Sequence, residues 1–387
     1  MSLKLDSHTD LARRPRYRRL VRRFPPRARR PVAIVVLALG AGILALAAIS
    51  EPSGRARGKP LLVLAVSAPD AARLFVLGDG RCRATGCAIL FRSSDAGRKY
   101  TPAGAPPGWH DNGTLPTLVF ANARDGYALI GDRLYTTHDG ALRWSWVERG
   151  DSVDGVFVAA GRAYTEVCLR RNAGSCRVLS SPVAEDRFAG LRLPPMPRTA
   201  SRQTDSLDDI ESSGDTVLAL LEPGSGSPGL LAASNDRGRT FREMTDPSCL
   251  GGTVAPAGSR VVWIKCITGL ESGISRSIDR GRSASSTRAS DLSNAALLAG
   301  VSGATAIVDC CGGSERLELL TDGGRRIRPV GPPHDANLGW LWLHFVDDRN
   351  GFALRIGSYE TTPSQLWRTR DGGVRWSLVP LPNVPIR

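Results

Sequence analysis

Six aspartates recur along the chain inside a similar octapeptide, and they are the first candidates for chemistry. The octapeptide reads Ser or Thr, any residue, Asp, any residue, Gly, two further residues and an aromatic. The aspartates are Asp95, Asp139, Asp236, Asp279, Asp322 and Asp371, with Trp144 and Trp376 as the clearest aromatics. The copy around Asp322 is weaker, because it lacks the hydroxyl and the aromatic. Carboxylates could act as acids or metal ligands. Six copies cannot all form one active site, so we expect a turn in which carboxylate and hydroxyl bind exposed backbone groups and the aromatic packs between neighbouring units.

The spacing of these aspartates predicts a repeat array. The gaps are 44, 97, 43, 43 and 49 residues, so one gap is almost two periods long. In the middle of that gap, Ser181 and Phe188 occupy the hydroxyl and aromatic positions of a further copy that has lost its Asp and Gly. The chain therefore contains seven units of about the same length.

Short apolar runs separated by turn residues precede the octapeptides. They are residues 118–120, 126–130 and 134–135 before the second copy, and 343–346, 351–356 and 365–367 before the last. About four short strands in a unit of this length are typical of a propeller blade. The sequence predicts an all-β fold, a seven-bladed β-propeller over residues 60–385. Residues 194–215, rich in Pro and then in Ser and Asp, predict an insertion over one face.

The octapeptide resembles the Asp-box (BNR) repeat. Residues 120–144 and 345–376, with Phe, Asp, Gly, an aromatic and then Thr-x-Asp-Gly in order, are most similar to the units of Ycf48-like photosystem II assembly and stability factors. The exo-sialidases also contain Asp boxes and are a more distant resemblance. The Ycf48-like resemblance implies an extracytoplasmic scaffold or binding propeller.

A resemblance to sialidases implies three arginines around a substrate carboxylate, a Tyr nucleophile paired with Glu, and an Asp acid/base. The expected Arg-Ile-Pro context is absent from residues 60–88, whose arginines are Arg73, Arg81 and Arg83. Two Tyr–Glu pairs remain, Tyr164 with Glu166 and Tyr359 with Glu360. We therefore predict a non-enzymatic binding or assembly scaffold with no catalytic residue and no cofactor. A diverged sialidase-like glycoside hydrolase is the alternative.

Eight cysteines in an exported chain indicate disulfides and no metal site. Cys168 and Cys176 flank a predicted hairpin turn, which makes pairing across the strands easy. The other candidate pairs are Cys82 with Cys87, Cys249 with Cys266, and the adjacent Cys310 with Cys311. Eight cysteines allow many pairings, so other partners or buried thiols remain open for the last pair.

The N-terminal region combines a basic tail with an apolar run. Of the net charge of +14, residues 1–31 contribute +9, and residues 32–49 are 18 consecutive residues without a charge. We interpret residues 1–31 as a cytoplasmic tail, 32–50 as a transmembrane signal anchor, 51–59 as a linker and 60–385 as an extracytoplasmic propeller. A cleaved signal peptide and an Arg-rich nucleic-acid arm are the alternatives. The expected partner is an envelope protein or glycan, and not nucleic acid.

Overall fold

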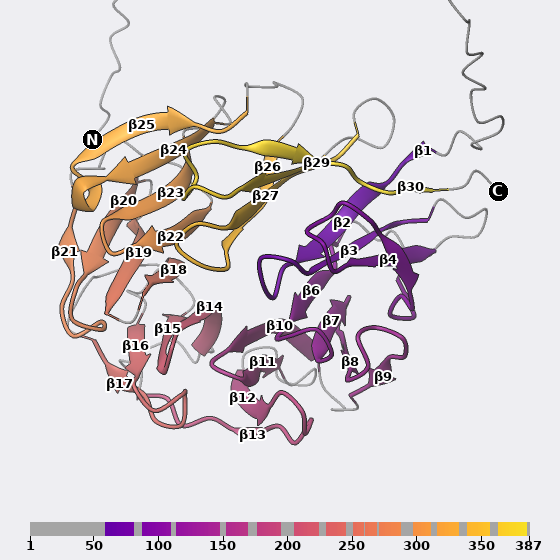
Figure 1. Ribbon diagram of the computed structural model, residues 1–387. Coiled ribbons are helices and arrows are strands. Elements are labelled where there is room, and N and C mark those ends of the chain that lie inside the picture. The colour runs from indigo at the N-terminus through magenta and orange to yellow at the C-terminus, as the bar shows by residue number, and fades with distance from the viewer. Residues whose placement is uncertain are drawn as a thin grey trace, which may run out of the picture. The chain divides into compact units, whose positions relative to one another are not determined.

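The propeller prediction is confirmed by the fold. The computed structural model describes residues 59–80, 87–109, 114–147, 152–168, 176–194, 205–223, 230–244, 251–258, 260–268, 271–287, 297–310, 316–332, 339–356 and 363–384. These residues form seven four-stranded antiparallel sheets and one two-stranded pair. Figure 1 shows the sheets following one another in chain order, from β2 to β29. The protein is an all-β, seven-bladed β-propeller.

Each blade consists of four consecutive strands. Blade 1 contains β2 (Leu62–Ser67), β3 (Leu74–Asp79), β4 (Ala88–Ser93) and β5 (Thr101–Ala103). Blade 2 contains β6 (Thr117–Phe120), β7 (Gly126–Ile130), β8 (Arg133–Thr137) and β9 (Ser145–Trp146). Blade 3 contains β10 (Ser152–Ala159), β11 (Arg162–Cys168), β12 (Cys176–Pro182) and β13 (Ala189–Gly190). Blade 4 contains β14 (Asp205–Ser213), β15 (Thr216–Pro223), β16 (Leu230–Ser234) and β17 (Arg242–Glu243).

The remaining three blades repeat this order. Blade 5 contains β18 (Gly251–Ala257), β19 (Val261–Thr268), β20 (Glu271–Ser277) and β21 (Ser285–Ser286). Blade 6 contains β22 (Leu298–Ser302), β23 (Thr305–Cys310), β24 (Arg316–Thr321), the 3-10 turn η2 (Asp322–Gly324) and β25 (Arg326–Val330). Blade 7 contains β26 (Gly339–Phe345), β27 (Gly351–Ile356), β28 (Gln365–Thr369) and β29 (Ser377–Val379). The runs predicted before the second and last octapeptides are all strands.

The first strand of each blade lies innermost and contacts the first strands of its neighbours, and β2 closes the circle against β27 of blade 7. Only the short pair β1 (Lys59–Pro60) and β30 (Asn383–Val384) joins the two ends of the described chain by backbone hydrogen bonds. No described blade borrows a strand from the other end of the chain. Ring closure therefore depends on side-chain packing between blades 1 and 7.

The hydrophobic core lies between successive blades, which explains why strands such as β7 and β16 are buried along their whole length. Between blades 1 and 2, Phe75 stacks on Phe120, with ring centroids 3.5 Å apart. Between blades 7 and 1, Leu61 and Val63 pack with Phe352 in one buried cluster. Strands buried on both faces become runs of apolar residues without strict alternation.

Side chains also link the inner strands to one another. Ser67 Oγ accepts the Phe120 amide at 2.8 Å, and Ser212 Oγ accepts the Ala160 amide at 2.8 Å. On the next junction, Asp209 Oδ2 accepts the Val254 amide at 2.8 Å. Each inner strand is the edge of its sheet, and these bonds satisfy edge amides that have no ladder partner.

One sequence prediction is wrong. Residues 205–213, part of the predicted insertion over 194–215, form the inner strand β14 of blade 4. The acidic residues in this segment are typical of a loop, but here they belong to a strand. The carboxylates of Asp208 and Asp209 accept hydrogen bonds from backbone amides of the neighbouring strand β18.

The N-terminal predictions lie outside the described residues, because residues 1–31, 32–50 and 51–58 are not among them. In the part of the chain that is described, no helix has the length and apolar character to cross a membrane.

Candidate functional site

The octapeptides all lie between the third and fourth strands of their blades, and the carboxylates of five of the six aspartates are occupied by the turn itself. In blade 7, Thr369 Oγ1 donates to Asp371 Oδ1 at 2.9 Å and accepts the Gly373 amide at 2.9 Å. Asp371 Oδ1 also accepts the Arg375 amide at 2.9 Å. The copies around Asp95, Asp139, Asp236 and Asp279 have the same bonds. No carboxylate hydrogen bond of Asp322 occurs among the described residues.

These bonds hold the carboxylates in the ionised form. The bond from the Lys99 amide is the main reason that the pKa of Asp95 is lowered, and the bond from the Arg143 amide acts in the same way to lower the pKa of Asp139. A proton-donating acid would need a raised pKa instead. The geometry therefore favours the structural role over acid catalysis at the turns.

The fourth position of the octapeptide has a feature that the sequence does not reveal. It adopts a left-handed backbone in all six copies with an intact Asp, although it is Ala96, Arg237 and Arg280 in three of them, with φ of 61–63°. The fifth position is left-handed as well. Two successive left-handed residues turn the chain sharply enough for the hydroxyl at the first position to accept the fifth amide.

The aromatic at the eighth position packs against the preceding blade. Trp144 of blade 2 donates its Nε1–H to the Gly104 carbonyl of blade 1 at 2.7 Å. Trp376 of blade 7 packs in the cluster formed by Ile307 and Leu317 of blade 6. The aromatics therefore help to hold neighbouring blades together.

The copy that lost its Asp contributes to a cluster that sequence reasoning missed. His138, at the second position of the blade 2 octapeptide, contacts Asp125 Oδ1 through Nδ1 at 2.8 Å and Asp186 Oδ2 through Nε2 at 2.8 Å. Asp186 is the sixth residue of the degenerate blade 3 copy. Burial tends to lower the pKa of His138, but the bonds to Asp186 and Asp125 raise it overall. The imidazolium thus bridges two blades through an ion pair with each carboxylate.

The central cavity is the main candidate for ligand binding. It has a volume of about 580 Å³ and is lined by residues of β2, β6, β10, β14 and β26 with their adjoining loops. Apolar side chains such as Val66, Phe157 and Leu341 dominate the lining, and the half-exposed Leu115 lies at its edge. Glu211 and His344 are the ionisable side chains among these residues.

Burial removes most of the charge from this cavity at neutral pH. Burial, and then the neighbouring carboxylate of Asp209, raise the pKa of Glu211. Burial lowers the pKa of His344 to about 4, and its ring stacks on Trp342 with centroids 5.7 Å apart. A protonated Glu211 and a neutral His344 leave an almost uncharged channel, whose accessible surface is about equally polar and apolar.

The residues that a sialidase would need do not meet in the described lining of this cavity. The hydroxyl of the fully buried Tyr164 lies against Gly238 of the blade 4 turn, and burial raises the pKa of Tyr164 to about 12. Glu166 Oε2 accepts the Leu207 amide at 3.3 Å between blades 3 and 4. Tyr359, Glu360, Arg81 and Arg83 lie outside the described residues, and Arg73 bonds to Asp70 in the β2–β3 loop.

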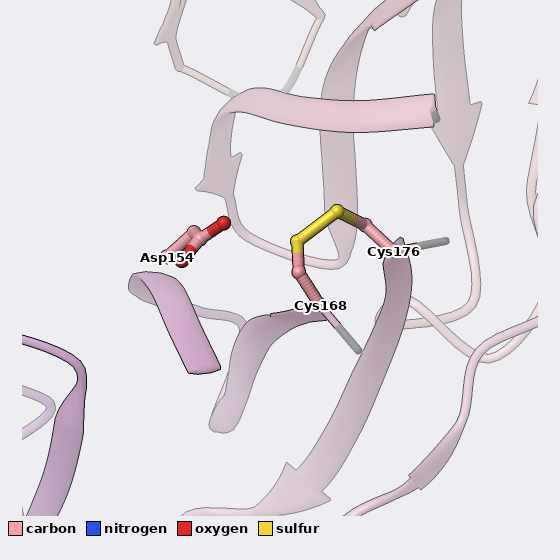
Figure 2. A group of neighbouring side chains, drawn as sticks. All are labelled: Asp154, Cys168 and Cys176. Atoms are coloured by element: carbon pink, nitrogen blue, oxygen red, sulfur yellow. A yellow bond between two sulfur atoms is a disulfide. The ribbon is translucent and has the colours of Figure 1, made fainter. Parts of the chain in front are cut away.

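The cysteines form disulfides where the structure describes them. Cys168 and Cys176 are opposite partners on β11 and β12 and are joined, as the hairpin predicts (Figure 2). Their sulfurs and Asp154 lie within 4.8 Å of one another, but sulfurs in a disulfide are not the thiolates that a metal binds. Cys87 and Cys266 are also disulfide-bonded. Cys82, Cys249, Cys311 and the side chain of Cys310 lie outside the described part, so the other pairings stay predictions.

The fold and the turns define a seven-bladed β-propeller, and known structures share that fold. The sequence matches no family model and no curated protein. A structure of YCF48 bound to D1 peptide has a TM-score of 0.51 at 16% identity, covering 81% of this chain and 95% of that one. YCF48 from Cyanidioschyzon merolae gives 0.54 at 12% identity, covering 81% and 96%. The propeller domain of the Trilobed protease from Pyrococcus furiosus, described as having an open velcro topology, gives 0.56 at 9% identity, covering 85% and 98%.

Proposed function

We propose that this protein is a non-enzymatic binding scaffold, whose central channel takes an apolar side chain or short apolar segment of an envelope protein. The observation that carries the proposal is the uncharged cavity of about 580 Å³, to which five of the seven blades supply mostly apolar residues. Apolar burial is non-directional and favours an apolar partner surface over the hydroxyl-rich surface of a glycan. The similarity in fold to YCF48 bound to a peptide is consistent with this use of the propeller.

The proposal includes the position of the propeller in the cell. The basic residues 1–31 and the apolar residues 32–50 support a membrane anchor with its N-terminus in the cytoplasm, and a linker at 51–59 would then lead to a propeller outside it. The recurrent octapeptides are, in this proposal, Asp-box turns with a structural role.

Site-specific crosslinking in intact cells tests the channel. A photo-crosslinking residue at Leu115, at the edge of the cavity, should capture one envelope protein, and the purified full-length protein should bind that partner directly. The matched control places the same residue at Leu378, which is somewhat more exposed than Leu115 but lies on the outer strand β29. Capture of the same partner only from Leu378, or no direct binding by the purified protein, would overturn the channel proposal.

Two further measurements separate the alternatives. The first is an assay of the purified protein with a fluorogenic sialoside. Hydrolysis that is lost in Tyr164→Phe would show that the protein is a glycoside hydrolase and not a scaffold. Protease added to intact cells should digest the propeller and spare the basic tail. The opposite pattern would contradict the proposed membrane orientation.

A further inference from the structure

A second cavity lies at the junction of the last and first blades, away from the channel. It has a volume of about 380 Å³ and is lined by Ala71, Ala72, Asp95, Ala96, Arg98, Arg368 and Arg370. Its residues come from the β2–β3 loop and the octapeptide of blade 1, and from β28 and the octapeptide of blade 7. Three guanidinium groups therefore line one small groove.

Arg368 is held rigidly at the base of this groove. Its Nη2 donates to the Ala71 carbonyl of blade 1 at 2.9 Å, and the guanidinium carbon lies 5.5 Å from the centre of the Phe352 ring. Its buried Nε has no hydrogen-bond partner. Its Nη2 also donates to Asn350 Oδ1 at 3.4 Å, and no hydrogen bond of Nη1 occurs among the described residues. A guanidinium fixed in this way is preorganised for an oxyanion.

Arg98 and Arg370 are exposed, and no ion pair of either occurs among the described residues. Burial, and then the like charges of Arg370 and Arg98, lower the pKa of Arg368, and the nearby carboxylate of Asp347, which is outside the groove lining, offsets this in part. The three arginine charges are therefore close enough to repel one another. The carboxylate of Asp95 is occupied by the Ser93 hydroxyl and the Lys99 amide. The described lining therefore carries three positive charges against one negative charge.

Comparison of the blade junctions shows what this groove lacks. The three arginines occupy defined positions of the repeat, namely the residue before the octapeptide, its second residue, and the sixth residue of the next octapeptide. Between blades 2 and 3 these are Thr136, His138 and Asp186, and both of the first two bond to the Asp186 carboxylate. Between blades 7 and 1 they are Arg368, Arg370 and Arg98. Among the seven junctions, only this one has arginine at all three positions. The anion that Asp186 supplies between blades 2 and 3 is replaced here by a further cation.

We propose that the groove between blades 7 and 1 binds a phosphomonoester through Arg98, Arg368 and Arg370. The excess of two positive charges matches a phosphate group, which carries about −1.5 to −2 at pH 7. Arginine forks bind phosphate oxygens in pairs. The groove is larger than phosphate alone, and Ala71, Ala72 and Ala96 provide apolar surface for the esterified group. A phosphorylated small molecule and a phospholipid head group share this chemistry.

Calorimetric titration of the full-length protein with glycerol 3-phosphate tests the site. Arg98→Asp places a carboxylate where blade 3 has Asp186, and it should weaken binding by about tenfold or more while the melting temperature stays the same or rises. Arg370→Gln should weaken binding too. The matched control is Arg239→Asp, which changes the same octapeptide position in blade 4 and should leave the affinity unchanged.

Equal affinity of the wild type and Arg98→Asp, or acetate binding as tightly as glycerol 3-phosphate, would overturn the proposal. Vesicles containing phosphatidic acid then identify the source. If Arg98→Asp also weakens vesicle binding relative to Arg239→Asp, the ligand is a lipid head group. If only glycerol 3-phosphate distinguishes the two variants, it is a soluble phosphomonoester. Failure of the channel crosslinking leaves this result unaffected, because the two sites share no residue.

Discussion

At the scale of single residues, the octapeptide hydroxyl is more deeply placed than the aspartate beside it. Thr369 is 1% exposed, whereas Asp371 is exposed, and the hydroxyl contacts both the carboxylate and the buried Gly373 amide. Water can replace a bond lost at the exposed carboxylate, but it cannot reach the buried amide. The hydroxyl should therefore contribute more to stability than the residue that makes the motif recognisable.

We expect Thr369→Val to lower the free energy of unfolding by about 1–3 kcal/mol, because the Gly373 amide is left buried without an acceptor. Asp322→Asn is the control, and it should change stability by less than about 0.5 kcal/mol, because the Asp322 carboxylate has no hydrogen bond among the described residues and Asn tolerates its left-handed backbone, φ 54°. Urea unfolding measures both. Equal losses in the two variants would contradict this assignment of the turn energetics.

The His138 cluster predicts a pH dependence. The pKa of His138 is raised in the folded protein, so its stabilising effect is complete below the ordinary value of about 6.5. The effect should disappear as the pH rises through the higher folded value. The melting temperature of the wild type should fall relative to that of His138→Gln over this range. A constant difference between the two from pH 5 to pH 9 would show that the charged imidazole contributes nothing.

At the scale of strands, side-chain packing explains why a phenylalanine at the end of the first strand is followed six residues later by a glycine in blades 2 and 7. A Cβ on Gly351, the first residue of β27, would lie 2.7 Å from the Phe345 ring, and one on Gly126 would lie 2.5 Å from the Phe120 ring. Each ring therefore covers the start of the second strand in its blade. This contact explains why the Phe and Gly recur six residues apart in blades 2 and 7.

Gly351→Ala should accordingly lower stability by about 1–3 kcal/mol through overpacking against Phe345. Gly190→Ala on the exposed strand β13 is the control, because nothing lies within 4 Å of the added Cβ. Thermal unfolding of both variants measures the difference. A fully stable Gly351→Ala would mean that the ring moves aside without cost.

The sequence is sufficient to predict the blades but not the contacts between them. The period of the Asp residues predicts seven units, and the short apolar runs predict the strands of blades 2 and 7. Both features can be predicted because a turn or a strand is determined mainly by residues that are close in sequence. The His138–Asp186 pair could not be predicted, since its partners are 48 residues apart and Asp186 lies outside the recognisable motif. The groove between Arg98 and Arg368 could not be predicted either, because its residues come from opposite ends of the propeller sequence. Asp208 and Asp209 are typical of a loop, and their role becomes clear only from their bonds to strand β18.

At the scale of the whole molecule, the junction of blades 7 and 1 is closed differently from the others, since no chain segment runs between these blades. Val384, 4% exposed, packs into the cluster that joins the two blades, and β30 pairs with only two residues of β1. Hydrophobic packing, Arg368 and a buried bond from the Val63 amide to Ser364 Oγ at 3.1 Å supply the remaining contacts. This junction should open before any other.

Val384→Asp should therefore accelerate amide hydrogen exchange in blades 1 and 7 and leave blade 4 unchanged. Val374→Asp, at an exposed position of the blade 7 octapeptide, is the control and should leave exchange unchanged throughout. Mass spectrometry of exchanged peptides measures this. Uniform acceleration in all seven blades would show that the ring unfolds as a single unit.

The pairing of β1 with β30 also determines how the molecule would respond to mechanical force. A pull on the chain preceding Lys59 is transmitted first to two backbone-paired residues and then to Leu61 in the cluster between blades 1 and 7. The point of load is therefore the one junction that no continuous chain reinforces. Tension applied from that end would detach blade 1 from blade 7, while the junctions between blades that follow one another in the chain remained closed. The arginine groove would then be pulled apart, because its residues belong to blades 1 and 7.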